Sequence, residues 1–333
     1  MREFLDRMLA LTTQAMSAHP STPDVRRFGS TSVSLRCTNP SFRQILREEI
    51  TLPASLPSPD GVRIDVWDCA STGMDPPSLP HFVNPEAPYE FATDGFLIDA
   101  NVGSALIWNE ETRHALLWAR DLSNPPEWYR AAPLRLLLTI LGPLGDAVLV
   151  HGSAVEYHGG AALLIGASGS GKSTTARLAE LAGATHFADD QVVAYRSNGR
   201  FVADPLYRAR KMQLDNETLP NLTPNDDLTV VHTSSSKSVL RPVASTEFPD
   251  TVPIAALITP DLTSSEPLAP VSGTVMFQRL LQACLQDGVV TDARVARSLL
   301  SLTQGVECLS LGLARQTDDV AADVLSFLSG HHD

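Results

Sequence analysis

Residues 161–183 read AALLIGASGSGKSTTARLAELAG, and this stretch decides the fold class. An apolar run at 161–165 is followed by a glycine-rich turn, and a helix-like segment then ends at Gly183. A short apolar strand, a tight loop and a helix in this order are typical of α/β proteins. The sequence therefore predicts an α/β unit around this segment.

The turn itself matches GxxxxGK[ST], the pattern of a phosphate-binding P-loop. Its glycines can adopt backbone angles that other residues avoid, so successive N–H groups can curl around anionic oxygens. The dipole of the following helix adds to that attraction. The residues expected to bind the phosphates of a nucleotide are Gly166, Ala167, Ser168, Gly169, Ser170, Gly171, Lys172, Ser173 and Thr174.

Three side chains of the motif have expected roles with ATP and Mg²⁺, which the motif implies as ligands. Lys172 is expected to reach the β- and γ-phosphates, Ser173 to supply a hydroxyl to Mg²⁺, and Thr174 to contact the α-phosphate. Phosphate binding alone leaves GTPases, ATPases, kinases and regulatory binding modules open. These classes of protein can be distinguished only by the residues that would face the group accepting the phosphate.

Composition limits the partners and the compartment. The chain has 333 residues, 43% of them hydrophobic, and a formal net charge of −13, so it can fill a sizeable core and repels nucleic acid and anionic lipid. Four cysteines lie far apart without a CxxC pair, which argues against disulfides and a zinc site. A cytoplasmic protein with no membrane span is expected, and a homo-oligomer stays an open alternative.

Proline-rich and glycine-rich segments divide the chain near residue 145. Residues 1–145 are expected to form a β-rich (α+β) accessory or substrate domain. It would begin with an amphipathic helix and contain strands at 61–69, 94–102, 104–111 and 113–120, the last two joined as a hairpin at 109–112. A helix at 128–144 would close it, despite Pro133.

Residues 146–333 are expected to form an α/β domain. Its predicted strands span 147–157, 161–167, 185–196, 199–204, 253–259 and 306–313. Its predicted helices span 172–183, 275–285, 291–302 and 318–329. The polar tract at 214–237 is interpreted as a loop or lid, because it can bury little apolar surface.

The acceptor side is expected at two places that flank the loop. Asp189 and Asp190 end the strand that follows the P-loop helix, and His151 lies in the strand that precedes the loop. Adjacent carboxylates beside Mg²⁺ can divide the work, one accepting a hydroxyl proton and one serving the metal. Two structural alternatives stay open here: an Asp pair that ends a strand or caps a turn, and a core position for His151.

Residues 151–196, HGSAVEYHGGAALLIGASGSGKSTTARLAELAGATHFADDQVVAYR, resemble the core of the HPr kinase/phosphorylase family. The resemblance implies a P-loop kinase core of the HPr-kinase/PEP-carboxykinase-like type. Carried over, it implies phosphate orientation for His151, the base that accepts a serine proton for Asp189, and metal or base support for Asp190. A looser resemblance to HPr-kinase-related proteins covers 130–333 and includes Lys237.

One departure bears on the substrate. Residues 203–215 read ADPLYRARKMQLD, where the enzymes that act on HPr have a glycine-rich signature containing Glu. The related group that phosphorylates serine on a ribosomally made peptide, as in lasso-peptide clusters, is more similar. The expected function is thus ATP- and Mg²⁺-dependent transfer of the γ-phosphate to serine of a peptide or protein. The alternatives are a small-molecule kinase and a nucleotide-dependent regulatory module without transfer activity.

Two weaker candidates complete the prediction. Asp261 follows an apolar strand in the manner of a Walker B acid, although Thr259 and Pro260 intervene. A local basic cluster could neutralise transition-state charge or bind an acidic substrate, and Lys237 is its preferred catalytic member. The alternative is a solvated loop. The cluster comprises Arg208, Arg210, Lys211, Lys237 and Arg241.

Overall fold

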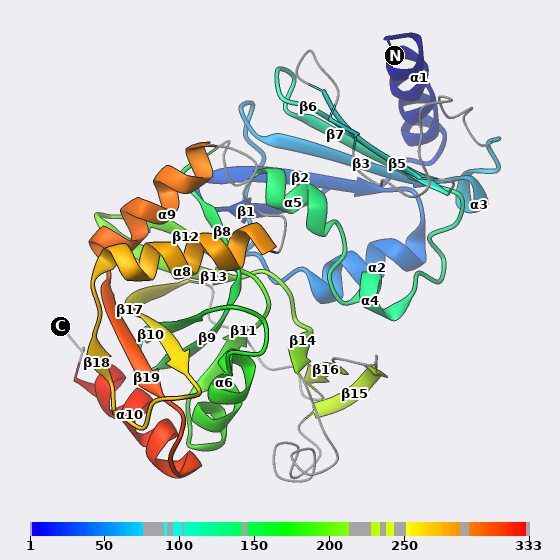
Figure 1. Cartoon of the computed structure of the whole chain (residues 1–333). Helices are drawn as coiled ribbons and strands as arrows, with labels where there is room; N and C mark the ends of the chain where they lie inside the picture. Colours follow the sequence, from blue (N-terminus) through cyan, green and yellow to red (C-terminus); the bar gives the residue numbers. More distant parts are fainter. Residues whose placement is uncertain are drawn as a thin grey trace. The chain divides into compact units, whose positions relative to one another are not determined.

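The computed structural model is a mixed α/β protein with several sheets (Figure 1). The residues it describes are 2–75, 90–91, 96–101, 103–141, 145–212, 228–233, 238–242, 251–286 and 293–330. The chain divides into two compact units, Met1–Glu48 with Ala54–Leu138, and Glu49–Pro53 with Thr139–Asp333. The sequence division was expected near residue 145. The short segment Glu49–Pro53, which belongs to the second unit, had no signal in the sequence.

The first unit is built on a mixed sheet with the order β1-β2-β3-β7-β6-β5-β4 in its described residues. The strands are β1 (Asp24–Phe28), β2 (Thr31–Cys37), β3 (Val62–Asp68), β4 (Glu90–Phe91), β5 (Phe96–Asn101), β6 (Ser104–Asn109) and β7 (His114–Ala119). Strand β3 is parallel to both β2 and β7. The predicted hairpin is confirmed, since Asn109 pairs with His114 in antiparallel β6 and β7.

An N-terminal helix covers one face of this sheet. Its apolar residues Leu5, Met8 and Ala15 pack with Trp67 and Trp118, as the amphipathic pattern predicts. The helices that begin in the first unit are α1 (Arg2–Ala18), α2 (Pro40–Glu49), α3 (Cys69–Thr72), α4 (Glu127–Arg130) and α5 (Arg135–Leu141). The single helix predicted at 128–144 is therefore wrong. Pro133 lacks an N–H, and Leu134 has a φ of 59°, which separates α4 from α5.

The second unit is built on a sheet with the order β11-β9-β10-β17-β13-β12-β8, to which β19 is added beside β17. Strands β10, β17 and β19 are parallel, whereas β9 is antiparallel to its neighbours β10 and β11. The strands are β8 (Val148–Val150), β9 (Gly152–Tyr157), β10 (Gly160–Ile165), β11 (Thr185–Ala188), β12 (Val192–Ser197), β13 (Arg200–Pro205), β17 (Val252–Asp261), β18 (Ala269–Pro270) and β19 (Glu307–Gly312).

Helices cover both faces of this sheet (Figure 1). On one face, α6 (Lys172–Leu181) and α10 (Thr317–Ser329) pack on β9 and β10 and share a core that includes Ala176, Leu164 and Val320. On the other face lie α8 (Gly273–Gln286) and α9 (Ala293–Gly305). Among the described residues, no helix combines the length and the apolar character that a bilayer crossing requires.

A separate three-stranded sheet has the order β14-β16-β15. It consists of β14 (Arg210–Met212), β15 (Leu228–Thr233) and β16 (Ser238–Pro242). Residues 228–233 were predicted to be part of a polar loop, and their pairing with β16 corrects that prediction. The remainder of the predicted lid, at 214–227 and 234–237, lies outside the described residues.

Two strands predicted as continuous are interrupted, and both interruptions fall at candidate site residues. The run at 147–157 divides at His151, because β8 pairs with β12 whereas β9 pairs with β10. A Cβ on Gly152 would lie 2.6 Å from the carbonyl oxygen of Leu164, so glycine permits this close pairing. The run at 185–196 divides at Asp190, whose φ of 67° is incompatible with a strand.

Candidate functional site

The topology of the sheet gathers the predicted site residues at one edge. Strands β11, β10, β17 and β19 all end there, and β9 begins there, because Gly152 pairs with Ile165 and Asp261 pairs with Gly312. The order of the strands therefore places the loop after β10 in the middle. The Asp pair and His151 flank it on the β9 and β11 side, and the loops after β17 and β19 flank it on the other.

The glycine-rich loop joins β10 to α6 with the backbone angles that its sequence requires. Gly166, Gly169 and Gly171 have φ values of 155°, 80° and 94°. A Cβ on Gly166 would lie 2.7 Å from the Oγ of Ser170, so a larger residue would collide there. The Nζ of Lys172 donates to the carbonyl oxygens of Gly166 and Ala167, each at 2.8 Å. The predicted strand, loop and helix are thus present.

Asp189 accepts hydrogen bonds from three groups and is only 2% exposed. The Oγ of Ser173 donates to its Oδ1 at 2.9 Å, and the Oγ of Ser153 donates to the same oxygen. The backbone N–H of Lys211 donates to Oδ2 at 2.7 Å. Burial raises the pKa of this carboxyl, and these hydrogen bonds offset part of the effect. Asp189 is thereby fixed to the first turn of α6 through Ser173.

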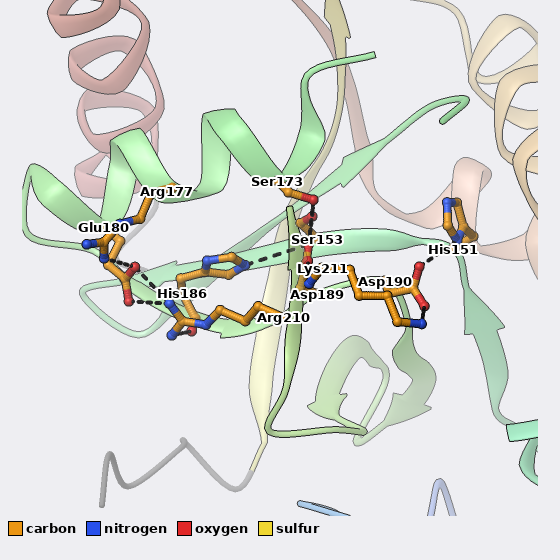
Figure 2. A network of polar contacts seen from close by, with 10 residues as sticks. All are labelled: His151, Ser153, Ser173, Arg177, Glu180, His186, Asp189, Asp190, Arg210 and Lys211. Atoms are coloured by element: carbon orange, nitrogen blue, oxygen red, sulfur yellow. Dashed lines mark hydrogen bonds and ion pairs between the residues drawn. The ribbon is translucent and has the colours of Figure 1, made fainter. Parts of the chain in front are cut away.

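Asp190 has a different environment, although it is the next residue (Figure 2). Its Oδ2 accepts from the Nζ of Lys211 at 2.7 Å, and its Oδ1 lies 3.8 Å from the Nδ1 of His151. The N–H of Gln191 donates to the carbonyl oxygen of Asp189 at 2.8 Å, so the chain turns tightly at Asp190. This turn directs two consecutive carboxylates to two different sets of partners.

A second polar cluster holds β14 beside this turn (Figure 2). Glu180 of α6 pairs with Arg177 and with the buried Arg210 of β14, whose other nitrogen donates to the carbonyl oxygen of His186 at 2.7 Å. Burial, together with the charges of Arg210 and Arg177, holds the pKa of His186 well below its ordinary value. Its ring is therefore neutral at neutral pH, and its Nε2 lies 3.9 Å from the Oδ1 of Asp189. The cluster positions the backbone from which Lys211 contacts the Asp pair.

A cavity of about 290 Å³ opens over the loop, and it is close in size to the smaller ligand pockets of proteins. Its lining contains residues of the glycine loop, the residues predicted to face the acceptor, and apolar residues from the loops after β17 and β19. The residues that line it are His151, Gly169, Gly171, Lys172, Ser173, Thr174, Thr175, Leu178, Asp190, Lys211, Leu262, Leu313, Arg315, Thr317 and Val320. Asp190 thus lines this cavity, whereas Asp189 lies buried behind Ser173.

Most of the predicted site residues that the structure describes are brought together. Lys237 lies outside the described residues. In the predicted basic cluster, Arg210 pairs with Glu180, Lys211 with Asp190 and Arg241 with Glu49, so each of these three cations has a carboxylate partner of its own. Asp261 accepts from the N–H and hydroxyl of Thr263 in its own loop, and these two bonds lower its pKa. Asp261 therefore caps a turn.

Sequence reasoning missed Ser153 and gave Lys211 no individual role. Ser153 could have been found, since it is a hydroxyl residue at the start of the strand that precedes the glycine loop. The expected contribution of Ser168 and Ser170 to phosphate binding remains a prediction. Among the described residues, the buried hydroxyls of Ser170 and Thr175 have no hydrogen-bond partner in the protein.

Comparison with known proteins identifies no family. No family model matches the chain, and no curated protein is similar to it. Among solved structures, the HPr(Ser) kinase/phosphatase from Coxiella burnetii matches 54% of this chain and 93% of its own length, with 8% sequence identity and a TM-score of 0.29. A likeness of this degree assigns neither an activity nor a ligand.

Proposed function

We propose that the chain is an ATP- and Mg²⁺-dependent kinase that transfers the γ-phosphate to a hydroxyl, and that the acceptor is a serine of a peptide or protein. The observation that carries the proposal is the pair of consecutive carboxylates beside the loop. Asp189 is hydrogen-bonded to Ser173 of the loop, whereas Asp190 lines the cavity. An ATP-binding loop with a carboxylate on each side of the reaction is what hydroxyl phosphorylation requires.

The loop and the start of α6 would bind the phosphates. Backbone N–H groups between Gly166 and Lys172 would donate to the phosphate oxygens, with the dipole of α6 adding to the attraction. The ammonium group of Lys172, which contacts two loop carbonyls, would exchange them for the β- and γ-phosphates.

The oxygen atoms of Ser173 and Asp189 fit Mg²⁺, which prefers hydroxyl and carboxylate oxygens and commonly binds through one or two carboxylates plus substrate phosphates. Mg²⁺ would neutralise the charge that develops on the β- and γ-phosphate oxygens. The short distance between the two side chains supports Asp189 as the acid on the metal side. This assignment reverses the roles that the resemblance implied for the two aspartates.

Asp190 would then face the acceptor. Its carboxylate would accept the proton of the serine hydroxyl as the serine oxygen bonds to the γ-phosphorus and the bond from that phosphorus to the bridging oxygen breaks, which releases ADP. His151, 3.8 Å from Asp190, would orient the carboxylate or the transferred phosphoryl group. Lys211 would hold the carboxylate of Asp190 in place and offset negative charge near the reacting oxygens.

The proposal is tested by incubating the protein with Mg²⁺, radiolabelled ATP and a library of serine-containing peptides, followed by mass spectrometry of the products. The expected result is a peptide with the mass of one added phosphate. Asp190→Asn should reduce transfer by at least about a hundredfold while Mg²⁺·ADP binding persists. Asp189→Asn should instead weaken the dependence of nucleotide affinity on Mg²⁺.

A different outcome would favour an alternative. If only small hydroxyl compounds were phosphorylated, the chain would be a small-molecule kinase with the same phosphate site. If ATP bound in a Lys172-dependent way and no acceptor were phosphorylated, it would be a nucleotide-dependent regulatory module. If Asp190→Asn kept full transfer activity, the proposed role of Asp190 would be wrong.

A further inference from the structure

The cavity over the glycine loop has a second end, to which the proposed function assigns neither a phosphate nor the acceptor. The loops after β17 and β19 lie on the side of the glycine loop opposite the Asp pair, as the strand order requires. They contribute Leu262, Leu313 and Arg315 to the lining, while α10 contributes Thr317 and Val320. This end thus presents three apolar side chains, in contrast to the end formed by His151 and Asp190.

Leu262 is the most unusual residue of this end, because 59% of a large apolar side chain is exposed there. Leu313 leans over the start of α6: a Cβ on Gly171 would lie 2.5 Å from its Cδ1 and 3.8 Å from the Cδ2 of Leu262. The two leucines therefore lie next to the phosphate loop and to each other. Covering Leu262 with a planar apolar ligand would remove this surface from water.

The backbone beneath the two leucines is fixed in advance. The N–H groups of Leu313 and Ala314 donate to the carbonyl oxygens of Asp261 and Ser264, each at 2.8 Å, which ties the two loops together. The guanidinium group of Arg315 is also held, since it donates to the carbonyl oxygen of Gly312 at 3.1 Å and pairs with Asp323. A preformed surface loses little conformational entropy when a ligand binds.

A buried hydroxyl in the lining of the cavity is the second sign of a ligand. Thr175 lies one turn into α6, lines the cavity and is 1% exposed. In the part of the chain that the structure describes, its Oγ1 has no hydrogen-bond partner, and a buried polar group without one is destabilising. A polar ligand that extends from the phosphate loop toward Leu178 and Leu313 would supply the missing partner.

From these observations we infer that the apolar end binds the base of the nucleotide, with Leu262 and Leu313 contacting its face and Thr175 contacting its polar connection to the phosphates. The inference rests on the proposed nucleotide site and goes further by naming the residues that bind the base. It requires that affinity come from the base as well as from the phosphates. ADP should therefore bind more tightly than inorganic pyrophosphate, which has the same number of phosphates and no base.

Isothermal titration calorimetry with Mg²⁺·ADP and with Mg²⁺·pyrophosphate tests this inference. Wild-type protein should bind ADP at least about tenfold more tightly than pyrophosphate. Leu262→Ser should reduce the affinity for ADP about fivefold to tenfold and leave that for pyrophosphate unchanged, because it removes apolar contact alone. Leu262→Asp, at the same exposed position, should reduce it further. The matched control is Leu285→Ser on α8, a leucine 53% exposed that does not line the cavity, and it should change neither affinity.

The outcomes separate this inference from the proposed function. Equal affinities of wild-type protein for ADP and pyrophosphate, both lost in Lys172→Ala, would overturn the base site and leave the phosphate site standing. An equal loss of both ligands in Leu262→Ser would also overturn it, because the leucine would then support the loop rather than the base. If wild-type protein bound neither ligand, the base site and the proposed function would both be wrong.

Discussion

Lys211 contacts two consecutive aspartates with two different groups. Its Nζ lies 2.7 Å from the Oδ2 of Asp190, and its backbone nitrogen lies 2.7 Å from the Oδ2 of Asp189. The side chain can therefore be changed while the contact with Asp189 is retained. This separation makes Lys211 a useful probe of how the two carboxylates divide their work.

Lys211→Met is expected to impair transfer more than binding. The variant removes the cation beside Asp190 but keeps the N–H that holds Asp189, so Mg²⁺·ADP should bind with an affinity close to that of wild-type protein. The rate of transfer should fall by about tenfold or more, the equivalent of roughly 1.4 kcal/mol or more of lost stabilisation. Steady-state kinetics should show the change in kcat rather than in the KM for ATP, and Lys211→Arg should restore part of it.

The matched control is Arg47→Met, which removes an exposed positive charge from α2. It should leave both kcat and the KM for ATP unchanged. A Lys211→Met variant that lost nucleotide binding and transfer together would show that the side chain acts on the nucleotide and not through Asp190.

Asp189 should make the stability of the ligand-free protein depend on pH. Burial raises its pKa above the ordinary value of 3.8, so ionisation of this carboxyl is less favourable in the folded protein than in the unfolded chain. The stability associated with this group is present below its unfolded pKa and is lost as pH rises through the folded pKa. Asp189→Asn removes that loss. Its unfolding free energy relative to wild-type protein should therefore increase as pH rises from about 4.

Chemical denaturation at a series of pH values in the absence of Mg²⁺ measures this difference. Asp261→Asn is a suitable comparison, because the pKa of that carboxyl is lowered by hydrogen bonds from Thr263 and its pH dependence has the opposite sign. A difference between Asp189→Asn and wild-type protein that stayed constant with pH would show that Asp189 has an ordinary pKa.

Glu180→Gln is expected to destabilise the second unit and to disturb the site from a distance. Glu180 is the carboxylate that pairs with both Arg177 and Arg210, and these arginines are 0% and 3% exposed. The substitution leaves two buried guanidinium groups without their carboxylate partner. The unfolding free energy should fall by about 2 kcal/mol, after allowance for the partial exposure of Glu180. Thermal denaturation measures the loss.

The control for this change is Glu111→Gln, at an exposed position in the turn between β6 and β7, which should leave the melting temperature unchanged. Because Arg210 precedes Lys211 in β14, Glu180→Gln should also lower transfer activity. Retention of both stability and activity would mean that β14 is positioned by its pairing with β16 alone.

The strand, loop and helix around Lys172 could be predicted because their signals are local. Glycines at fixed spacing, an apolar run and a helix pattern all lie within 161–183. The positions of His151 and the Asp pair were also indicated, although the continuous strands predicted through them were wrong. Breaks at His151 and Asp190 depend on which strand pairs with which, and this is a property of the whole sheet.

The remaining parts of the site come from distant segments of the chain, so they could not be predicted from local sequence patterns. Lys211 reaches the Asp pair because β14 pairs with β16 in a separate sheet, and Arg210 is held by Glu180, thirty residues earlier. Leu313 reaches the glycine loop because β19 is parallel to β17. In both cases the residue types are ordinary, and only the tertiary fold gives them a role.

The last prediction concerns the first unit, where Asp65 of β3 is 2% exposed and has three basic neighbours. Burial alone would raise its pKa, but hydrogen bonds from His114 and Arg36 outweigh that effect and hold the pKa below its ordinary value. Arg36 donates twice, at 2.7 and 2.8 Å. Arg36→Ala should therefore lower the unfolding free energy at neutral pH by about 1–2 kcal/mol, since Arg36 is itself partly exposed.

The pH dependence of that loss distinguishes an ion pair from a packing effect. A carboxyl with a lowered folded pKa contributes stability above its unfolded pKa, and this contribution disappears as pH falls through the folded value. The difference between Arg36→Ala and wild-type protein should accordingly be largest near neutral pH and shrink below about 4. Arg47→Ala, which removes an exposed arginine from α2, should show no such difference. A loss in Arg36→Ala that persisted unchanged in acid would mean that the stem of Arg36 stabilises the sheet by packing, and that Asp65 is held by His114 and Arg63.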